Sequence, residues 1–189
     1  SSRVAAGVLV GLCAASIASA GTVTIGFEGH FNTEHSAPIV RSGFEIGNPS
    51  GQEQHFHELD SVYWNSVGQV PSNGTGVLVN DRDTQIFVKS AGNLVFSLDS
   101  VDVAVPSTDP PFAGTLHIEG YLNNVFVGYI EVSSLSSTSY NTVGGGALGN
   151  VDMLVFDGVD NNGFFILDNL TLTTIPLPTG GAMGLAGFA

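Results

Sequence analysis

The fold is constrained most by short runs of alternating apolar and polar residues that are separated by turn-forming residues. Residues 22–27 alternate strictly. The run 115–121 alternates through Glu119, and a short segment that contains Asn123 and Asn124 joins it to the Val-, Phe- and Ile-rich run 125–132. Alternation with a period of two predicts strands with one buried face, and two such runs joined by a short turn predict a hairpin. Further runs at fairly even spacing predict about eight to ten strands and no convincing helix. The pattern therefore predicts an all-β fold, a two-sheet antiparallel β-sandwich of the jelly-roll type, over residues 21–174.

The charge balance is strongly acidic. Asp and Glu number 17 against four Lys and Arg residues, which gives a formal net charge of −13. Because no run of basic residues is present to neutralise a phosphate backbone, nucleic acid is not an expected partner. Carboxylates do supply the oxygen ligands that Ca²⁺ prefers. Cys13 is the single cysteine and lies in the N-terminal apolar stretch, so the mature chain is expected to have neither a disulfide nor thiol chemistry.

The two ends of the sequence differ in character from its centre. Residues 1–20 combine Arg3, an apolar small-residue run and the sequence Ala18-Ser19-Ala20, which is the pattern of a secretory signal peptide with its cleavage site. At the other end, Ile175-Pro176-Leu177-Pro178 interrupts strand pairing, and residues 179–189 are uncharged and rich in Gly and Ala. That stretch is too short to cross a bilayer, which takes about 20 residues. We therefore expect export, a β domain at 21–174 and a tail at 175–189.

Three of these features together resemble the PEP-CTERM proteins of exopolysaccharide-producing bacteria. They are the signal peptide, the acidic β body ending in the apolar run 165–172, and the tail motif Ile175-Pro176-Leu177-Pro178, which is similar to the VPLPA-type variant of that sorting signal. The resemblance implies a cell-surface or extracellular location, processing by a protease of the exosortase type, and a membrane anchor through the C-terminal tail. In residues 179–189 the transmembrane helix of the family pattern is incomplete and the basic cluster is absent, a departure that fits truncation of the tail at residue 189.

The last expected strand carries a carboxylate among apolar residues. Alternation places Asp168 on one face with four apolar side chains, those of Phe164, Ile166, Leu170 and Leu172. A buried carboxylate is costly unless it is paired or bound to a metal. First and last strands of a sandwich often lie side by side, which would bring Glu28 close. Glu28 and Asp168 are thus predicted ligands of a structural Ca²⁺, similar to that of jelly-roll carbohydrate-binding modules. The alternative is that Asp168 lies at a sheet rim, bonded to backbone or water.

Four aromatic side chains are candidates for contact with a carbohydrate. They are Tyr63, Trp64, Tyr121 and Tyr129, whose rings can cover the apolar face of a sugar. Strand parity predicts that Tyr121 and Tyr129 point outward, while Leu116, Ile118, Phe126 and Ile130 point inward. The alternative is that these aromatic rings cover sheet surface or pack in the core.

The remaining groups of polar residues are weaker evidence for a metal or catalytic site. His55 and His57 share a face if they lie on a strand, but no third metal ligand is fixed beside them. Glu58 and Asp60 begin the spaced-carboxylate pattern of a jelly-roll glycosidase without a third member, and a solvated outer face accounts better for Glu119 and Glu131.

The sequence therefore predicts a non-enzymatic, exported surface or matrix protein with a structural or adhesive role. The alternatives are a carbohydrate-binding module that binds a polysaccharide and a glycoside-active enzyme. The oligomeric state is left open.

Overall fold

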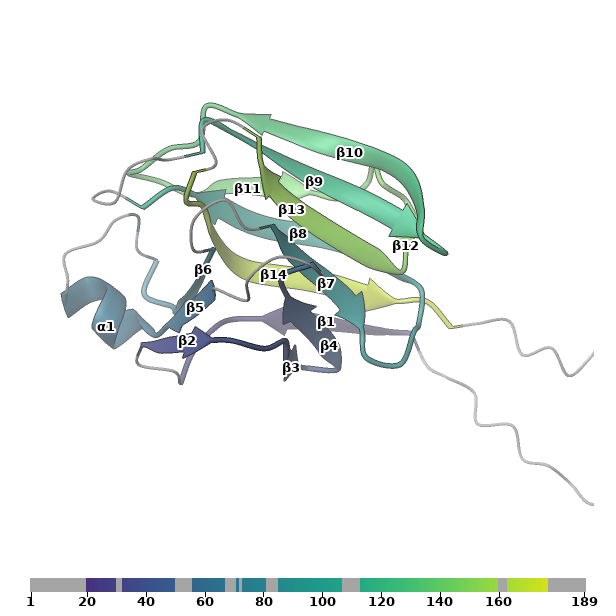
Figure 1. The fold of residues 1–189 in the computed structure, drawn as a ribbon, viewed down its shortest axis with the longest axis horizontal. Coiled ribbons are helices and arrows are strands. Elements are labelled where there is room, and N and C mark those ends of the chain that lie inside the picture. The colour runs from purple at the N-terminus through teal and green to yellow at the C-terminus, as the bar shows by residue number, and fades with distance from the viewer. Residues whose placement is uncertain are drawn as a thin grey trace, which may run out of the picture.

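The protein is an all-β sandwich of two antiparallel sheets, as the alternation predicts (Figure 1). The computed structural model describes residues 20–29, 32–49, 56–66, 71, 73–80, 85–106, 113–159 and 163–176. The predicted signal peptide, apart from Ala20, and the tail beyond residue 176 lie outside these residues. Within the described ranges, no helix is both long and apolar enough to span a membrane.

Sheet A contains eight strands among the described residues, in the order β11-β8-β14-β6-β5-β2, with β1 also paired to β14 and β12 to β8. Their bounds are β1 Gly21–Ile25, β2 Thr33–His35, β5 Phe56–Leu59, β6 Val77–Asn80, β8 Phe96–Ala104, β11 Asn141–Gly144, β12 Asn150–Val151 and β14 Ile166–Thr174.

Sheet B contains six strands among the described residues, in the order β10-β9-β13-β7-β4-β3. Their bounds are β3 Ile39–Arg41, β4 Phe44–Gly47, β7 Ile86–Ser90, β9 Thr115–Leu122, β10 Val125–Ser133 and β13 Met153–Gly158. The chain passes repeatedly from one sheet to the other, for example from β7 to β8 to β9 and from β13 to β14, so each sheet is built from strands that are distant in sequence.

The main core lies between the two sheets. Alternate residues of facing strands fill it, such as Leu98 and Leu167 from sheet A with Ile118 and Phe156 from sheet B. The expected inward face of β1 is confirmed, because Ile25 and Phe27 are buried in this core and Val23 packs against it. The predicted neighbourhood of the first and last strands is confirmed as well, with β1 paired to β14 from Gly21↔Thr174 to Ile25↔Leu170.

A smaller apolar cluster covers part of the outer face of sheet A. It contains Leu59, Trp64, Val77, Val79, Ala104 and Ile166. Trp64 comes from α1 (Ser61–Ser66), a short helix between β5 and β6 that the sequence pattern did not predict. Asp60 caps this helix, because its Oδ1 accepts a hydrogen bond of 2.8 Å from the backbone N–H of Tyr63. Asp60 thus stabilises the first turn of a helix, which a pattern with a period of two cannot predict.

A bulge in β14 overturns the predicted side-chain parity of that strand. The register shifts after Asp168, and Asn169 takes a positive φ of 47°. Leu167, Leu170 and Leu172 all reach the main core, whereas Ile166 belongs to the outer cluster. Asp168 is fully buried, so it does not lie at an exposed rim, and it does not share a face with Leu170 and Leu172.

Candidate functional site

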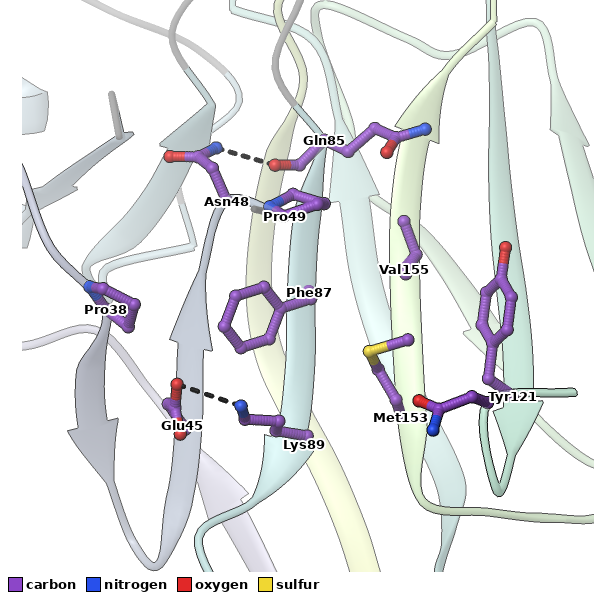
Figure 2. A pocket seen from close by; sticks show the side chains of 11 residues that line it. Pro38, Glu45, Asn48, Pro49, Gln85, Phe87, Lys89, Tyr121, Met153 and Val155 are labelled. Carbon is purple, nitrogen blue, oxygen red and sulfur yellow. Dashed lines mark hydrogen bonds and ion pairs between the residues drawn. The ribbon is translucent and has the colours of Figure 1, made fainter. Parts of the chain in front are cut away.

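A groove of about 640 Å³ crosses the outer face of sheet B (Figure 2). It is lined by Pro38, Glu45, Asn48, Pro49, Gln85, Phe87, Lys89, Tyr121, Asn124, Met153 and Val155. The strand residues among them alternate with core residues such as Val88 and Leu154, so they point away from the sandwich interior.

Strand register aligns the groove across the sheet. Glu45 of β4 lies opposite Lys89 of β7, Lys89 lies opposite Met153 of β13, and Met153 lies opposite Tyr121 of β9. A second row lies two residues away from the first along β7, β13 and β9. In it Phe87 is opposite Val155, Val155 is opposite Glu119, and Glu119 is opposite Tyr129. Because neighbouring strands lie about 4.8 Å apart, four strands give the groove a span of about 14 Å.

The floor of the groove is apolar and its rim is polar. Phe87 and Val155 form the floor with side chains that are 8% and 5% exposed. Lys89 Nζ lies 3.2 Å from Glu45 Oε1 and 5.1 Å from the centre of the Phe87 ring. Asn48 donates through Nδ2 to the backbone oxygen of Gln85 at 2.7 Å. These contacts hold the rim in place without any ligand.

Pro38 and Pro49 form one end of the groove. Pro38 packs directly on β4, where a Cβ at Gly47 would lie 3.0 Å from the proline ring. The absence of a side chain at Gly47 therefore lets the segment between β2 and β3 approach the sheet closely.

A buried ion pair holds both ends of that segment. Glu58 is 0% exposed and accepts hydrogen bonds from Arg41 through both carboxylate oxygens, with Nε at 2.9 Å from Oε1 and Nη2 on Oε2. His35 Nε2 lies 2.9 Å from Glu58 Oε2. His35 and Arg41 flank Pro38, and the pair joins β3 of sheet B to β5 of sheet A. The carboxylates considered for catalysis thus have structural contacts, Glu58 in this ion pair and Asp60 at the cap of α1.

Beyond Tyr121 the groove continues into an aromatic surface on the β9–β10 hairpin, which we call the aromatic shelf: His117, Tyr121, Phe126 and Tyr129. Ring centres lie 4.4 Å apart for His117 and Tyr129, 5.7 Å for Tyr121 and Phe126, and 6.5 Å for Phe126 and Tyr129. Phe126 and Tyr129 are 50% and 51% exposed. Two aromatic rings therefore present open faces to solvent on the same side of the sheet as the groove.

The predicted inward orientation of Phe126 is wrong. The register of β10 shifts between Phe126 and Gly128, where the φ of Gly128 is 152°. The shift places Phe126 opposite Tyr121 on the outer face. A glycine within an alternating strand was the available signal, since such glycines often mark a bulge.

Carboxylates surround the shelf. Glu119 Oε2 accepts a hydrogen bond of 2.6 Å from the hydroxyl of Tyr121, and this bond, with burial and nearby negative charge, raises the pKa of Tyr121 to about 12. His117 lies opposite both Glu131 and Asp157, with Nε2 at 3.5 Å from Glu131 Oε2. Glu119 lies opposite Tyr129, so Glu119 and Glu131 are diagonal neighbours and do not face each other directly.

The four aromatic candidates do not form one site. Tyr121 and Tyr129 lie together on the shelf, whereas Tyr63 and Trp64 belong to α1 on the outer side of sheet A. Trp64 is only 2% exposed and donates through Nε1 to the backbone oxygen of Pro71 at 2.8 Å, so its ring is not open to a ligand. The sequence reasoning missed Phe87 and Phe126, which lie on the groove floor and on the shelf.

The predicted calcium ligands make separate contacts. Asp168 Oδ2 accepts hydrogen bonds from Asn73 Nδ2 at 2.7 Å and Thr75 Oγ1 at 2.6 Å, and Oδ1 accepts one from the N–H of Asn169 at 2.6 Å. Burial raises the pKa of Asp168, although these bonds oppose the rise. Glu28 is exposed and lies 3.5 Å from Ser61. Calcium binding by Glu28 and Asp168 stays a prediction.

The described part of the chain contains no group of three or more His, Cys, Asp or Glu side chains arranged to hold a metal ion. Of the histidine pair considered as ligands, His57 is half-buried on β5 and His55 lies outside the described residues.

No protein-family model matches this sequence, and no curated protein matches it. Among solved structures, the chain is similar to a family 29 carbohydrate-binding module from Piromyces equi, with 14% identity, a TM-score of 0.44, and coverage of 84% of this chain and 93% of that one. It is similar to a DUF4465 family protein from Bacteroides caccae, with 15% identity, a TM-score of 0.47, and coverage of 89% and 99%. It is also similar to a Stig cyclase from Fischerella sp. TAU, with 11% identity, a TM-score of 0.47, and coverage of 84% and 100%.

Proposed function

We propose that this chain is a non-catalytic carbohydrate-binding β-sandwich that acts as an adhesive component of an extracellular polysaccharide matrix. The observation that supports the proposal is the groove across sheet B, with its apolar floor, its polar rim and its continuation into the aromatic shelf. Export is supported by the signal-peptide pattern of residues 1–20 and by the tail motif that begins at Ile175.

The groove suits the two-sided chemistry of a sugar ring. A pyranose has an apolar face that packs on aromatic rings and a rim of hydroxyl groups that need hydrogen-bonding partners. Tyr121 offers the first above the apolar floor of Phe87 and Val155, and Gln85 and Asn124 place amide groups along the edge. A span of about 14 Å has room for roughly three rings of an extended glycan, close to one ring for each strand interval.

The site is formed before any ligand arrives. The Lys89–Glu45 ion pair and the hydrogen bond from Asn48 to Gln85 fix two sides of the rim. Glu58 and Arg41 hold the segment that carries Pro38. A preformed site loses little conformational freedom on binding, which favours affinity for a stiff polymer.

A non-catalytic role is supported by the positions of the carboxylates. A glycosidase needs two carboxyl groups that flank one glycosidic bond. Glu58 is buried in an ion pair and Asp60 caps a helix. On the face itself, Glu119 is bonded to Tyr121, and Glu131 lies beside His117.

The test is affinity electrophoresis against soluble polysaccharides, followed by calorimetric titration with hexasaccharides of those retained. Tyr121→Ala and Tyr129→Ala should each weaken binding about tenfold or more, as for central aromatic contacts in other interfaces, with little change in melting temperature. Tyr63→Ala on the opposite sheet is the matched control and should bind like the wild type. Failure to bind any polysaccharide, or equal losses in all three variants, would contradict carbohydrate binding at this face.

Two further measurements address catalysis and export. Chromatography of the hexasaccharides after long incubation should show no shorter products, and the appearance of such products would favour the glycoside-active enzyme instead. N-terminal sequencing of protein recovered from the culture medium or cell surface should begin at Gly21. Recovery only from the cell interior would contradict the matrix role.

A further inference from the structure

We propose that the polysaccharide bound by the groove and the aromatic shelf carries free amino groups, and that these are bound at the shelf. The inference rests on the proposed function and names the chemical class of its ligand. It depends on two separate observations, the open aromatic rings of the shelf and the sign of the charge around them.

Among the described residues, Lys89 is the only Lys or Arg side chain that lines the groove or the aromatic shelf. The sequence contains four basic residues, Arg3, Arg41, Arg82 and Lys89. Arg41 is bound to the buried Glu58, and Lys89 is paired with Glu45. Arg3 and Arg82 lie outside the described residues. Strands β9, β10 and β13, which carry the shelf and its surroundings, contain no Lys or Arg.

Three carboxylates of these strands lie near one another on the face. Glu131 and Asp157 lie on either side of His117, and Glu119 is two residues along from His117 on the same face. Glu119 is thus a diagonal neighbour of both other carboxylates, at a separation of roughly 7–8 Å for such positions. A cation placed among them is attracted by all three negative charges, and a neutral sugar is not. The gain therefore favours an amino sugar over its uncharged counterpart.

The aromatic rings provide the place where such a cation can lie. Tyr129 is 51% exposed, and His117 approaches its ring at 4.4 Å. Glu119 is directly opposite Tyr129, and Glu131 is two residues along the same strand. An ammonium group over the open part of the Tyr129 ring gains a cation–π contact and has carboxylates within reach. The sugar ring that bears it can pack on the neighbouring Phe126.

The rest of the groove suits the uncharged parts of the same polymer. Lys89 lies two strands away from Tyr121 and already has Glu45 as its partner. Gln85 and Asn124 add amide groups and no net charge. The binding face thus consists of the nearly neutral groove and of the aromatic shelf with its carboxylates. One extended polysaccharide occupies both.

The test is calorimetric titration of the full chain with two hexasaccharides that differ only in N-acetylation. At pH 6 and low salt, the hexamer of glucosamine should bind about tenfold more tightly than the hexamer of N-acetylglucosamine, and added salt should reduce the difference. Glu131→Gln and Glu119→Gln should each weaken the glucosamine hexamer about fivefold, the effect of one carboxylate at about 4 Å in a water-like environment. Glu131→Gln should not change binding of the acetylated hexamer, whereas Glu119→Gln also alters the partner of the Tyr121 hydroxyl and is not used for that comparison. Asp99→Asn on β8 of sheet A removes the same charge elsewhere and is the control.

The outcomes separate the two proposals. If the acetylated hexamer binds as tightly as glucosamine hexamer, and Tyr121→Ala abolishes both, the amino-group inference fails and carbohydrate binding stands. If the glucosamine hexamer binds but neither Tyr121→Ala nor Glu131→Gln weakens it, the attraction is a general one to an acidic protein and the inference is overturned. If neither hexamer binds, and cellohexaose and a polyuronate also fail to bind, both proposals are wrong.

Discussion

The ion pair between Arg41 and Glu58 joins the two sheets and positions one end of the groove, so its removal tests both the fold and the site. We choose Arg41→Met, which keeps most of the apolar stem and removes the guanidinium. Glu58 is 0% exposed and would then retain His35 as its remaining partner from this cluster. A buried carboxylate that loses its guanidinium partner is strongly unfavourable, because burial removes the water that would otherwise solvate the charge.

Breaking a buried ion pair by removing one partner costs about 3–5 kcal/mol. The side chain of Arg41 is 27% exposed, so water can reach part of the vacated space and reduce the penalty. We therefore expect a loss of about 2–3 kcal/mol in the free energy of unfolding, or about 5–10 °C in melting temperature for a chain of this size. The double variant Arg41→Met/Glu58→Met removes the stranded charge as well. It should recover at least half of the loss, which a double-mutant cycle would report as coupling.

Urea unfolding can be followed through the fluorescence of Trp64, the single tryptophan, which is buried in the native protein. The control is Lys89→Met, which breaks the more exposed pair with Glu45 and should cost less than about 1 kcal/mol. A loss for Arg41→Met no larger than that for Lys89→Met would refute the structural role of the buried pair. The same variant should also weaken polysaccharide binding, because the segment that carries Pro38 loses its anchor.

Three other predictions concern positions outside the groove. Burial raises the folded-state pKa of Asp168 above the unfolded value of about 3.9, so its contribution to stability is present below that pH and is lost as the pH rises through the folded pKa. Between about pH 4 and neutrality, the free energy of unfolding should therefore fall less for Asp168→Asn than for the wild type. An equal fall in the two proteins would contradict this. Gly76→Ala should cost about 3 kcal/mol or more in urea unfolding, because its Cβ would lie 2.5 Å from the backbone oxygen of Phe27, whereas Gly146→Ala meets open space and should be nearly neutral. Calcium binding by Glu28 and Asp168 predicts that EDTA lowers the melting temperature, and an unchanged value would leave Asp168 as a hydrogen-bonded group alone.

The sequence determined the fold class because the alternation of side chains is a local property of an extended chain. Residues 22–27 alternate, and the structure buries Ile25 and Phe27 on one face. The hairpin of β9 and β10 was predictable for the same reason, since both strands flank a short segment in which Asn123 and Asn124 take positive φ values. The sequence also singled out Asp168 as a carboxylate among apolar residues, but it did not decide between burial and a position at the sheet rim.

The predicted orientation of side chains was wrong where a bulge adds one residue to a strand. Beyond the bulge at Asn169, every following side chain of β14 turns to the opposite face from the one that simple counting predicts. The bulge between Phe126 and Gly128 does the same on β10 and adds a ring to the shelf. Gly128 was a visible sign of irregularity, but the sequence around Asn169 offered no comparable one.

The groove and its supports were decided by the tertiary structure alone. Pro38, Phe87 and Tyr121 come from three separate regions of the chain, and the order of strands in sheet B makes them neighbours. Glu58 similarly meets Arg41 because their strands belong to different sheets that pack together. A period of two tells which side chains share a face of one strand. It says nothing about which strand lies beside it, because that choice depends on how all the strands together bury their apolar faces.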